Sequence, residues 1–354
     1  MSARPRTRRR EVVEAIEQGA VLLSARGQVL AINDTARSLL GLDPDDRTRT
    51  AKEVLTAPAL VDAVEEVTES RRAISLDLDH AGTQLRASVS LVRDEVLLLL
   101  TDRTEEHRVE QLRRDFVANT SHELKTPVAA IQTLAEALAV VADEQPDRVP
   151  ALVARLNGEA TRLATLVYDL LDLRRLEERG PHERAAVDLA EVVRRVVAGR
   201  FDRAQAAGVE VVVDAPDHLE IPGARGDLEM IVQNLLSNAI TYNHEGGTVT
   251  LTVRPVAQDD GAPAEAGGIP GAQVELVVED TGIGIPEEDL TRVFERFYRV
   301  DAARSRSTGG TGLGLSIVRH AVEHHQGSIE LTSEVGVGTR CVVRLPATEA
   351  VLTG

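Results

Sequence analysis

Residues 104 to about 178 carry the pattern that most limits what this chain can fold into. They are charged, poor in glycine, and apolar at helical spacing on both sides of a break near Asp143–Asp147. After the break, leucines recur every seven residues with others between them, at Leu156, Leu163, Leu166, Leu170 and Leu173. The pattern predicts two helices, each with a narrow apolar seam. Because such a hairpin cannot enclose a core by itself, we expect two copies to form an antiparallel four-helix bundle.

The first of these helices contains a lone histidine, His122, followed at once by Glu123. Thr126 lies four residues after the histidine and therefore one turn away on the same face. Pro127 lacks an N–H and crowds the carbonyl of Glu123, so we expect the helix to bend there. Because a neutral imidazole is a good nucleophile toward phosphorus near neutral pH, His122 is a candidate phosphoryl acceptor.

The chain has 354 residues and a formal net charge of −17, which argues against direct nucleic-acid binding. Arginines nevertheless cluster in residues 1–10, which we interpret as a disordered basic tail, with contact to an anionic membrane as the alternative. The single cysteine, Cys341, excludes an internal disulfide and is expected to be a small buried hydrophobe. No uninterrupted run of about 18 apolar residues occurs, so we expect no transmembrane helix and a cytoplasmic chain, with membrane association as the alternative if the native N-terminus is longer.

Two further units are expected beside the hairpin, which we assign to residues 104–180. Residues 11–103 predict a small α+β unit in which Asn33 caps a helix that Gly41 ends. Its strand-like runs are 21–23, 29–32, 73–79, 84–92 and 95–101. Residues 187–348 alternate helices and strands, and 349–354 form a tail. The helix candidates there are 189–207, 227–242, 287–296 and 313–325, and the strand candidates are 209–213, 248–254, 274–279, 329–332 and 340–345. The segment 257–272 reads as a flexible insertion rich in glycine, proline and alanine.

Three motifs in the last unit suit a nucleotide triphosphate. Asn234 and Asn238 lie four apart on one helical face, and amide oxygens are suitable ligands for Mg²⁺. Asp280–Gly284 follows a strand, so its glycines allow close backbone approach and its carboxylate can accept a hydrogen bond from an exocyclic amine. Gly309–Gly314 opens a helix, where backbone N–H groups and the dipole attract anions. Each motif alone also fits a helix surface, a turn or a loop.

Basic residues gather between the second and third motifs, which suits a lid over phosphates, although a solvated basic face is the alternative for any one of them. They are Arg292, Arg296, Arg299, Arg304 and Arg306. His320 and His324 lie four apart and could ligate a metal, but the sequence offers no third ligand. Histidines near a helix C-terminus also favour the dipole, so we interpret this pair as structural.

In this order and spacing, the motifs closely resemble the boxes of the sensor histidine kinases of bacterial two-component systems, over roughly residues 105–347. The matching segments are Phe116–Pro127 for the phosphoacceptor box, Asn234–Asn238 with Tyr242 for the N box, Asp280–Gly284 for the first glycine box, Phe294–Tyr298 for the Phe box, Gly310–Gly314 for the second glycine box, and Gly336–Thr339 for the last element near adenine. The sequence of the stretch Phe294–His320 most resembles that of the kinases of phosphate-starvation systems.

The resemblance implies an α+β multidomain protein in which the hairpin forms a homodimer and a Bergerat-type α/β sandwich binds ATP. It implies that ATP phosphorylates His122, which passes the phosphoryl group to an aspartate of a response regulator receiver domain. Glu123 would hydrogen-bond the other ring nitrogen of His122, and Thr126 would help position water for dephosphorylating the regulator. The implied nucleotide contacts are Asn234, Asn238, Tyr242, Asp280, Gly282, Gly284, Gly310, Thr311, Gly312, Leu313, Gly314 and Thr339, with Asn238 and Asn234 holding Mg²⁺.

Thr241 departs from the family pattern, because many members carry a lysine there that can contact phosphate. The phosphate charge must then be met by Mg²⁺, glycine-loop amides and arginines.

Residues 11–103 resemble a PAS sensor domain more weakly, through the early strand pair with Asn33 and through Asp102–Thr104. Residues 1–115 contain no aromatic residue and no cysteine, which discounts a flavin photosensor. Haem ligation by His80 or His107 and a purely structural relay stay open. For the whole chain, the alternatives are a catalytically weak scaffold and another ATPase of the same fold.

Overall fold

The computed structural model describes residues 5–42, 50–178, 184–256, 272–300 and 310–347, and its contacts divide the chain into two compact units, 1–118 and 119–354. The boundary between these units falls inside the long helix α5, Thr104–Glu144. The expected insertion at 257–272, except Ala272, and the tail at 349–354 lie outside the described residues, as do Arg304 and Arg306.

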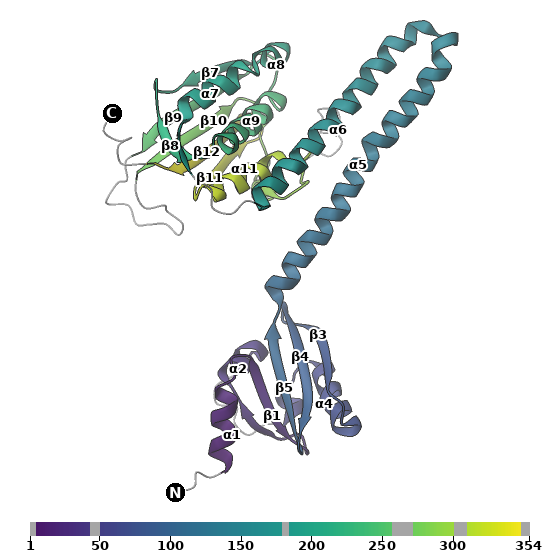
Figure 1. Cartoon of the computed structure of the whole chain (residues 1–354), viewed down its shortest axis with the longest axis vertical. Coiled ribbons are helices and arrows are strands. Elements are labelled where there is room, and N and C mark those ends of the chain that lie inside the picture. Colours follow the sequence, from purple (N-terminus) through teal and green to yellow (C-terminus); the bar gives the residue numbers. More distant parts are fainter. Residues whose placement is uncertain (1–4, 43–49, 179–183, 257–271, 301–309, 348–354) are drawn as a thin grey trace. The chain divides into compact units, whose positions relative to one another are not determined.

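The N-terminal unit is built on a five-stranded antiparallel sheet with strand order β2-β1-β5-β4-β3 (Figure 1). The strands are β1 Gly19–Ser24, β2 Val29–Ile32, β3 Ile74–His80, β4 Thr83–Val92 and β5 Glu95–Asp102, so all five expected runs are confirmed. The helices are α1 Pro5–Glu14, α2 Asp34–Leu40, α3 Ala51–Val54 and α4 Pro58–Ser70. The aliphatic core contains Leu23, Leu60, Leu98 and Leu100, each 0% exposed.

Asn33 joins the first strand pair to α2, as its position in the sequence predicts. Its side-chain oxygen accepts hydrogen bonds from the backbone N–H groups of Ala36 and Ala20, both at 2.9 Å. Its side-chain nitrogen donates to the carbonyls of Ile16 and Gln18. The first bond caps α2, and Gly41 ends that helix in the left-handed conformation at φ 65°. The buried amide is therefore fully used in local structure.

The arginine-rich start of the chain differs from the expected disordered tail. Helix α1 already begins at Pro5, and Arg9 pairs with Glu95 at 2.6 Å. Proline at the first helical position is favourable, because its missing N–H has no partner there in any case. Val13, near the helix end, is 3% exposed and packs with Ala20, Leu22 and Ala31. This apolar contact explains why a strongly basic segment is held as a helix.

The helical hairpin consists of α5, a short turn η1 Pro146–Arg148, and α6 Val149–Glu178. Helix α5 continues through Pro127, so the expected bend does not interrupt the helix. Leu166 and Leu173 are buried, at 3% and 1% exposed, but Val128 and Val140 on α5 are 41% and 61% exposed. An apolar surface of this kind in one copy of the hairpin fits the expectation that a second surface covers it.

Among the described helices, α5 is long and apolar enough, over Thr104–Ala142, to cross a membrane on length and composition alone. The sequence shows no uninterrupted apolar run here, because ten charged residues lie within this stretch. A single helix of this kind is a weak indication of a membrane span, since helices of soluble proteins meet the same criterion.

The C-terminal α/β part has a five-stranded sheet of order β11-β12-β10-β9-β7, antiparallel except for the β7–β9 pair (Figure 1). Its strands are β7 Glu210–Asp214, β9 Thr248–Val256, β10 Gln273–Asp280, β11 Ser328–Glu334 and β12 Gly338–Pro346. Helices α7 Leu189–Ala198, α9 Arg225–Thr241 and α11 Gly314–His324 pack against one another and against the sheet. Cys341 is buried on β12, as expected, and burial raises the pKa of its thiol to about 12.

Two local expectations in this part were wrong, and one pair of strands was missed. The helix expected at 189–207 is divided into α7 and α8 Phe201–Ala206, with Gly199 following α7. The helix expected at 287–296 is instead two 3₁₀ turns, η2 Glu287–Asp289 and η3 Arg292–Phe294. Apolar residues three apart, Leu290 and Val293, fit the three-residue period of a 3₁₀ turn as well as a helix. The short strands β6 Ala185–Asp188 and β8 Glu220–Gly223, which pair with each other, were not foreseen.

Candidate active site

The N box and the second glycine box meet at the N-terminus of α11. Asn234 and Asn238 lie on α9, and Gly314 is the first residue of α11. A Cβ added at Gly314 would stand 2.8 Å from Asn234 Oδ1 and 3.8 Å from Asn238 Nδ2. Asn234 Nδ2 donates to the carbonyl of Met230 at 3.0 Å, which turns its oxygen toward this loop. The structure thus brings two amide side chains to an anion-attracting helix N-terminus.

The first glycine box closes the end of β10. Asp280 Oδ1 accepts hydrogen bonds from the N–H groups of Gly282 at 2.8 Å and Thr339 at 3.3 Å. Burial raises the pKa of Asp280, and these two bonds act in the opposite direction. Gly284, at φ 69°, packs directly against the backbone of Glu334, so a side chain there would collide with it. The carboxylate is therefore held at a half-buried site by the loop that follows it.

Tyr242 and the Phe box complete the surroundings of the second glycine box. A Cβ at Gly310 would lie 3.0 Å from the Tyr242 hydroxyl, and the carbonyl of Tyr242 accepts from the N–H of Ile283 at 3.1 Å. Phe297 donates its N–H to the carbonyl of Gly312 at 2.8 Å. Both residues have positive φ, 64° for Phe297 and 73° for Gly312. All the motifs predicted to contact nucleotide thus lie together around one end of the sheet.

The second unit also places the hairpin histidine beside the Phe box. A groove of about 320 Å³ is lined by Asn119, His122, Glu123, Glu295, Arg296, Phe297 and Tyr298. His122 is exposed, and the Thr126 hydroxyl donates to the His122 carbonyl at 3.2 Å. Glu123 forms an ion pair at 3.5 Å with Arg162 of α6, whose side chain is 12% exposed. The exposed His122 therefore lines a groove that it shares with the Phe box.

One contact links the second glycine box to α6. Thr311, 8% exposed, donates its hydroxyl to Asp169 Oδ2 at 2.6 Å and accepts from the N–H of Leu313 at 3.3 Å. Burial raises the pKa of Asp169 to about 6. The bond from Thr311 opposes this shift, and the nearby charge of Asp172 adds to it. No local sequence pattern indicates this contact, because Asp169 and Thr311 are 142 residues apart.

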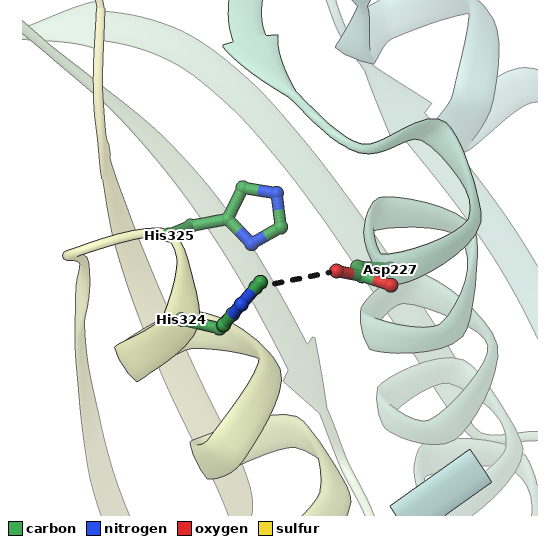
Figure 2. Close-up of side chains that lie close together, drawn as sticks. All are labelled: Asp227, His324 and His325. Atoms are coloured by element: carbon green, nitrogen blue, oxygen red, sulfur yellow. Dashed lines mark ion pairs between the residues drawn. The ribbon is translucent and has the colours of Figure 1, made fainter. Parts of the chain in front are cut away.

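A cluster of Asp227, His324 and His325 lies at the other end of α11 (Figure 2). His324 Nδ1 is 3.6 Å from Asp227 Oδ2. His325 Nδ1 contacts the Ala321 carbonyl at 2.8 Å, and its Nε2 accepts from the N–H of Ala224 at 3.1 Å. Burial lowers the pKa of His325, which keeps it neutral with both nitrogens in use. The cluster therefore ties α11 to the start of α9. Its possible ligand atoms lie within 4.8 Å of one another, and His324 is grouped with His325 and Asp227, not with His320 as the sequence spacing suggested.

Sequence reasoning missed two arginines that touch site residues. Arg162 pairs with Glu123, whereas the expected partner of Glu123 was the His122 ring. Arg203 of α8 donates to Thr241 Oγ1 at 3.0 Å. A cation therefore lies beside Thr241, the position where many family members carry a lysine. Burial lowers the pKa of Arg203. Its helical neighbours carry no recognisable motif, and only the tertiary fold brings it to α9.

Comparison with known proteins agrees with this architecture. Residues 112–179 match the His Kinase A (phospho-acceptor) domain, and residues 223–349 match the histidine kinase-, DNA gyrase B- and HSP90-like ATPase family. A helical hairpin bearing an exposed histidine, joined to an ATPase domain of this type, defines an ATP-dependent phosphotransfer protein. ATP is thus the nucleotide that this domain binds.

Individual similar proteins show which kind of phosphotransfer protein this chain resembles. The chain is 39% identical over 298 residues to the sensor-like histidine kinase SenX3 of Mycolicibacterium smegmatis, covering 80% of this chain and 73% of that protein. It is 35% identical over 347 residues to SenX3 of Mycobacterium tuberculosis, covering 95% and 79%. A crystal structure of histidine kinase ThkA in complex with the response regulator TrrA shares the fold, with TM-score 0.50, 20% identity, and coverage of 96% of this chain and 98% of that chain.

The chain belongs to the sensor histidine kinases, and its activity is that of a protein-histidine kinase. The family resemblance drawn from the sequence boxes and the α+β multidomain fold class are both confirmed. The prediction of a protein-histidine kinase is likewise confirmed.

Proposed function

We propose that His122 is the phosphoryl acceptor of this kinase and that the groove beside the Phe box is where it receives the phosphoryl group. The observation that carries the proposal is the lining of that groove, which joins His122 and Glu123 to Arg296 and Tyr298. In the reaction, a ring nitrogen of His122 attacks the γ-phosphorus. The new P–N bond replaces the bond to the oxygen that bridges the β- and γ-phosphates, and ADP leaves.

Glu123 is proposed to set the tautomer of the His122 ring and to offset its positive charge. Its ion pair with Arg162 supports a fixed carboxylate position on this side of the hairpin. Arg296 lines the same groove and adds positive charge next to the acceptor. The replacement of His122 described in the Discussion is the direct test of the acceptor.

Nucleotide contacts are proposed for each residue of the glycine and N boxes. Asp280 would accept a hydrogen bond from the adenine amine, supported by the inward position that Gly282 and Thr339 give its carboxylate. Asn238 and Asn234 would hold Mg²⁺, whose charge offsets that of the phosphates. The amide oxygen of Asn234 beside Gly314 suits such a hard cation. The remaining proposed contacts are Tyr242, Gly282, Gly284, Gly310, Thr311, Gly312, Leu313, Gly314 and Thr339.

We also propose that the protein works as a homodimer through the hairpin. The half-buried seam residues Leu156, Leu163 and Leu170 of α6 and the exposed Val128 and Val140 of α5 are the surface that a second copy would cover. Sedimentation of the full chain at micromolar concentration should give the mass of two copies. Replacing Leu163 with aspartate in the seam should shift the species to one copy, whereas the same change at exposed Val212 of β7 should not. A wild-type protein that sediments as a monomer would refute the dimer.

The partner proposed for phosphohistidine is the receiver domain of a response regulator, with Thr126 serving the reverse reaction. The Thr126 hydroxyl is one turn from His122 and exposed, so it can orient a water molecule toward a regulator docked on the hairpin. Thr126→Ala should lower dephosphorylation of a phosphorylated regulator by about 10-fold or more, while autophosphorylation changes little. Thr133→Ala, which removes another exposed α5 hydroxyl bonded to its own helix, is the matched control. Equal loss of both activities in Thr126→Ala would remove Thr126 from this role.

For the N-terminal unit we propose a PAS-like sensor, supported by its five-stranded antiparallel sheet and by the Asp102–Thr104 turn. Asp102 Oδ1 accepts from the N–H and the hydroxyl of Thr104, at 2.8 and 2.6 Å, where β5 passes into α5. We assign the sensor to residues 11–103, the hairpin to 104–180 and the ATP-binding domain to 187–348. A cytoplasmic location is proposed, with membrane contact only through the basic N-terminus, and fractionation of cells expressing the native gene tests it.

A further inference from the structure

The glycine loop proposed to hold the ATP phosphates is already bonded to an acidic side chain of the hairpin. Asp169 Oδ2 lies 2.6 Å from the Thr311 hydroxyl, and Thr311 stands between Gly310 and Gly312. Helices α6 and α11 are in contact beside this bond. The carboxylate therefore approaches the loop at the N-terminus of α11, the same electropositive position that a phosphate group would take.

Two features make this contact a competitor of nucleotide. A triphosphate and a carboxylate are both negative, so they repel each other when both lie at the glycine loop before α11, where Asp169 accepts from the Thr311 hydroxyl. The Asp169 carboxylate is also poorly compensated, because no cation is paired with it among the residues that the structure describes, and Asp172 adds a like charge. Such a contact is held by one charge-assisted hydrogen bond and by the helix dipole, and it can be released.

We propose that Asp169 is an internal latch that occupies the phosphate loop in place of nucleotide and holds it on the hairpin until ATP displaces it. The proposal rests on the assignment of Gly310–Gly314 as the phosphate loop. Nucleotide binding and release of the loop from α6 are then one coupled event. A signal that moves α6 changes the fraction of molecules with a free loop, and with it the apparent affinity for ATP.

The test is nucleotide affinity, measured by displacement of a fluorescent ATP analogue from the full chain with His122 replaced by glutamine, so that no phosphorylation intervenes. Asp169→Ala should lower the Kd for ATP by about 5- to 10-fold, because the competent loop no longer has to be freed. Asp169→Asn keeps an acceptor of the same shape and loses only the charge, so a smaller decrease, about 2- to 5-fold, is expected. Glu159→Gln, a neutralised acid ten residues earlier on α6, should leave the Kd unchanged.

The outcomes separate the latch from the site on which it rests. Unchanged affinity in both Asp169 variants, with the wild type binding normally, overturns the latch alone. Weaker binding only when Mg²⁺ is present makes Asp169 a metal ligand and likewise overturns it. No binding of nucleotide by any of the proteins overturns the phosphate loop itself. Thermal melting curves of Asp169→Asn show whether the variant is less stable than the wild type. Because asparagine has the same shape as aspartate, a large loss of stability would give Asp169 a structural role and overturn the latch.

Discussion

Replacing His122 with glutamine should reduce phosphorylation of the chain by [γ-³²P]ATP to background. The variant keeps a polar side chain of similar reach but has no nitrogen that can attack phosphorus. The label on the wild type should be labile in acid and stable in alkali, which is the behaviour of a phosphorus–nitrogen bond. Since His122 is exposed and the Thr126 hydroxyl bonds to its backbone carbonyl, which glutamine also has, we expect the substitution to leave the packing unchanged.

The matched control is His107→Gln, which removes another exposed histidine from the same helix, α5. It should be labelled like the wild type. The Kd for ATP, measured separately by displacement of a fluorescent analogue, should differ less than about twofold among the three proteins, because His122 belongs to the hairpin and not to the nucleotide loops. Acid-labile label that persists in His122→Gln would assign the acceptor to another histidine.

Local sequence signals were sufficient for most of the secondary structure. The alternation of apolar residues located all five strands of the first sheet, and Asn33 and Gly41 marked the start and the end of α2. These features depend on neighbouring residues, and a pattern in the chain records them directly. The two 3₁₀ turns at 287–294 were predicted as a helix, because apolar residues three apart fit a 3₁₀ turn and an α-helix equally well.

The boxes of the candidate site were also visible, because each box is a short segment with a characteristic composition. The contacts that hold these elements together were not visible in the sequence. The Asp169–Thr311, Glu123–Arg162 and Arg203–Thr241 contacts connect elements far apart in the chain. In each pair at least one partner is an ordinary charged residue on a helix, which most often faces solvent. Only the packing of α6 on α11, of α5 beside α6, and of α8 beside α9 gives these side chains a partner.

Asp280→Asn should raise the Kd for ATP by about 10- to 100-fold, the loss expected when a charge-assisted hydrogen bond to the ligand is removed. The asparagine has the shape of the original side chain, and its oxygen can still accept from the N–H groups of Gly282 and Thr339. Its second polar atom is then an NH₂ group, which donates where the adenine amine also donates. The loop is preserved, and the contact with the base becomes a mismatch.

The design has a second readout that a merely unfolded variant could not produce. A purine triphosphate with an oxygen at position 6, such as inosine triphosphate, presents an acceptor to the new amide, so the ratio of its Kd to that of ATP should fall in Asp280→Asn. Glu279→Gln neutralises the adjacent, exposed acid on β10 and should leave both constants unchanged. Displacement titrations at fixed Mg²⁺ measure all six combinations of protein and nucleotide. If Asp280→Asn bound ATP as tightly as the wild type and kept the same preference, this carboxylate would not read the base, and the bonds from Gly282 and Thr339 would be its whole role.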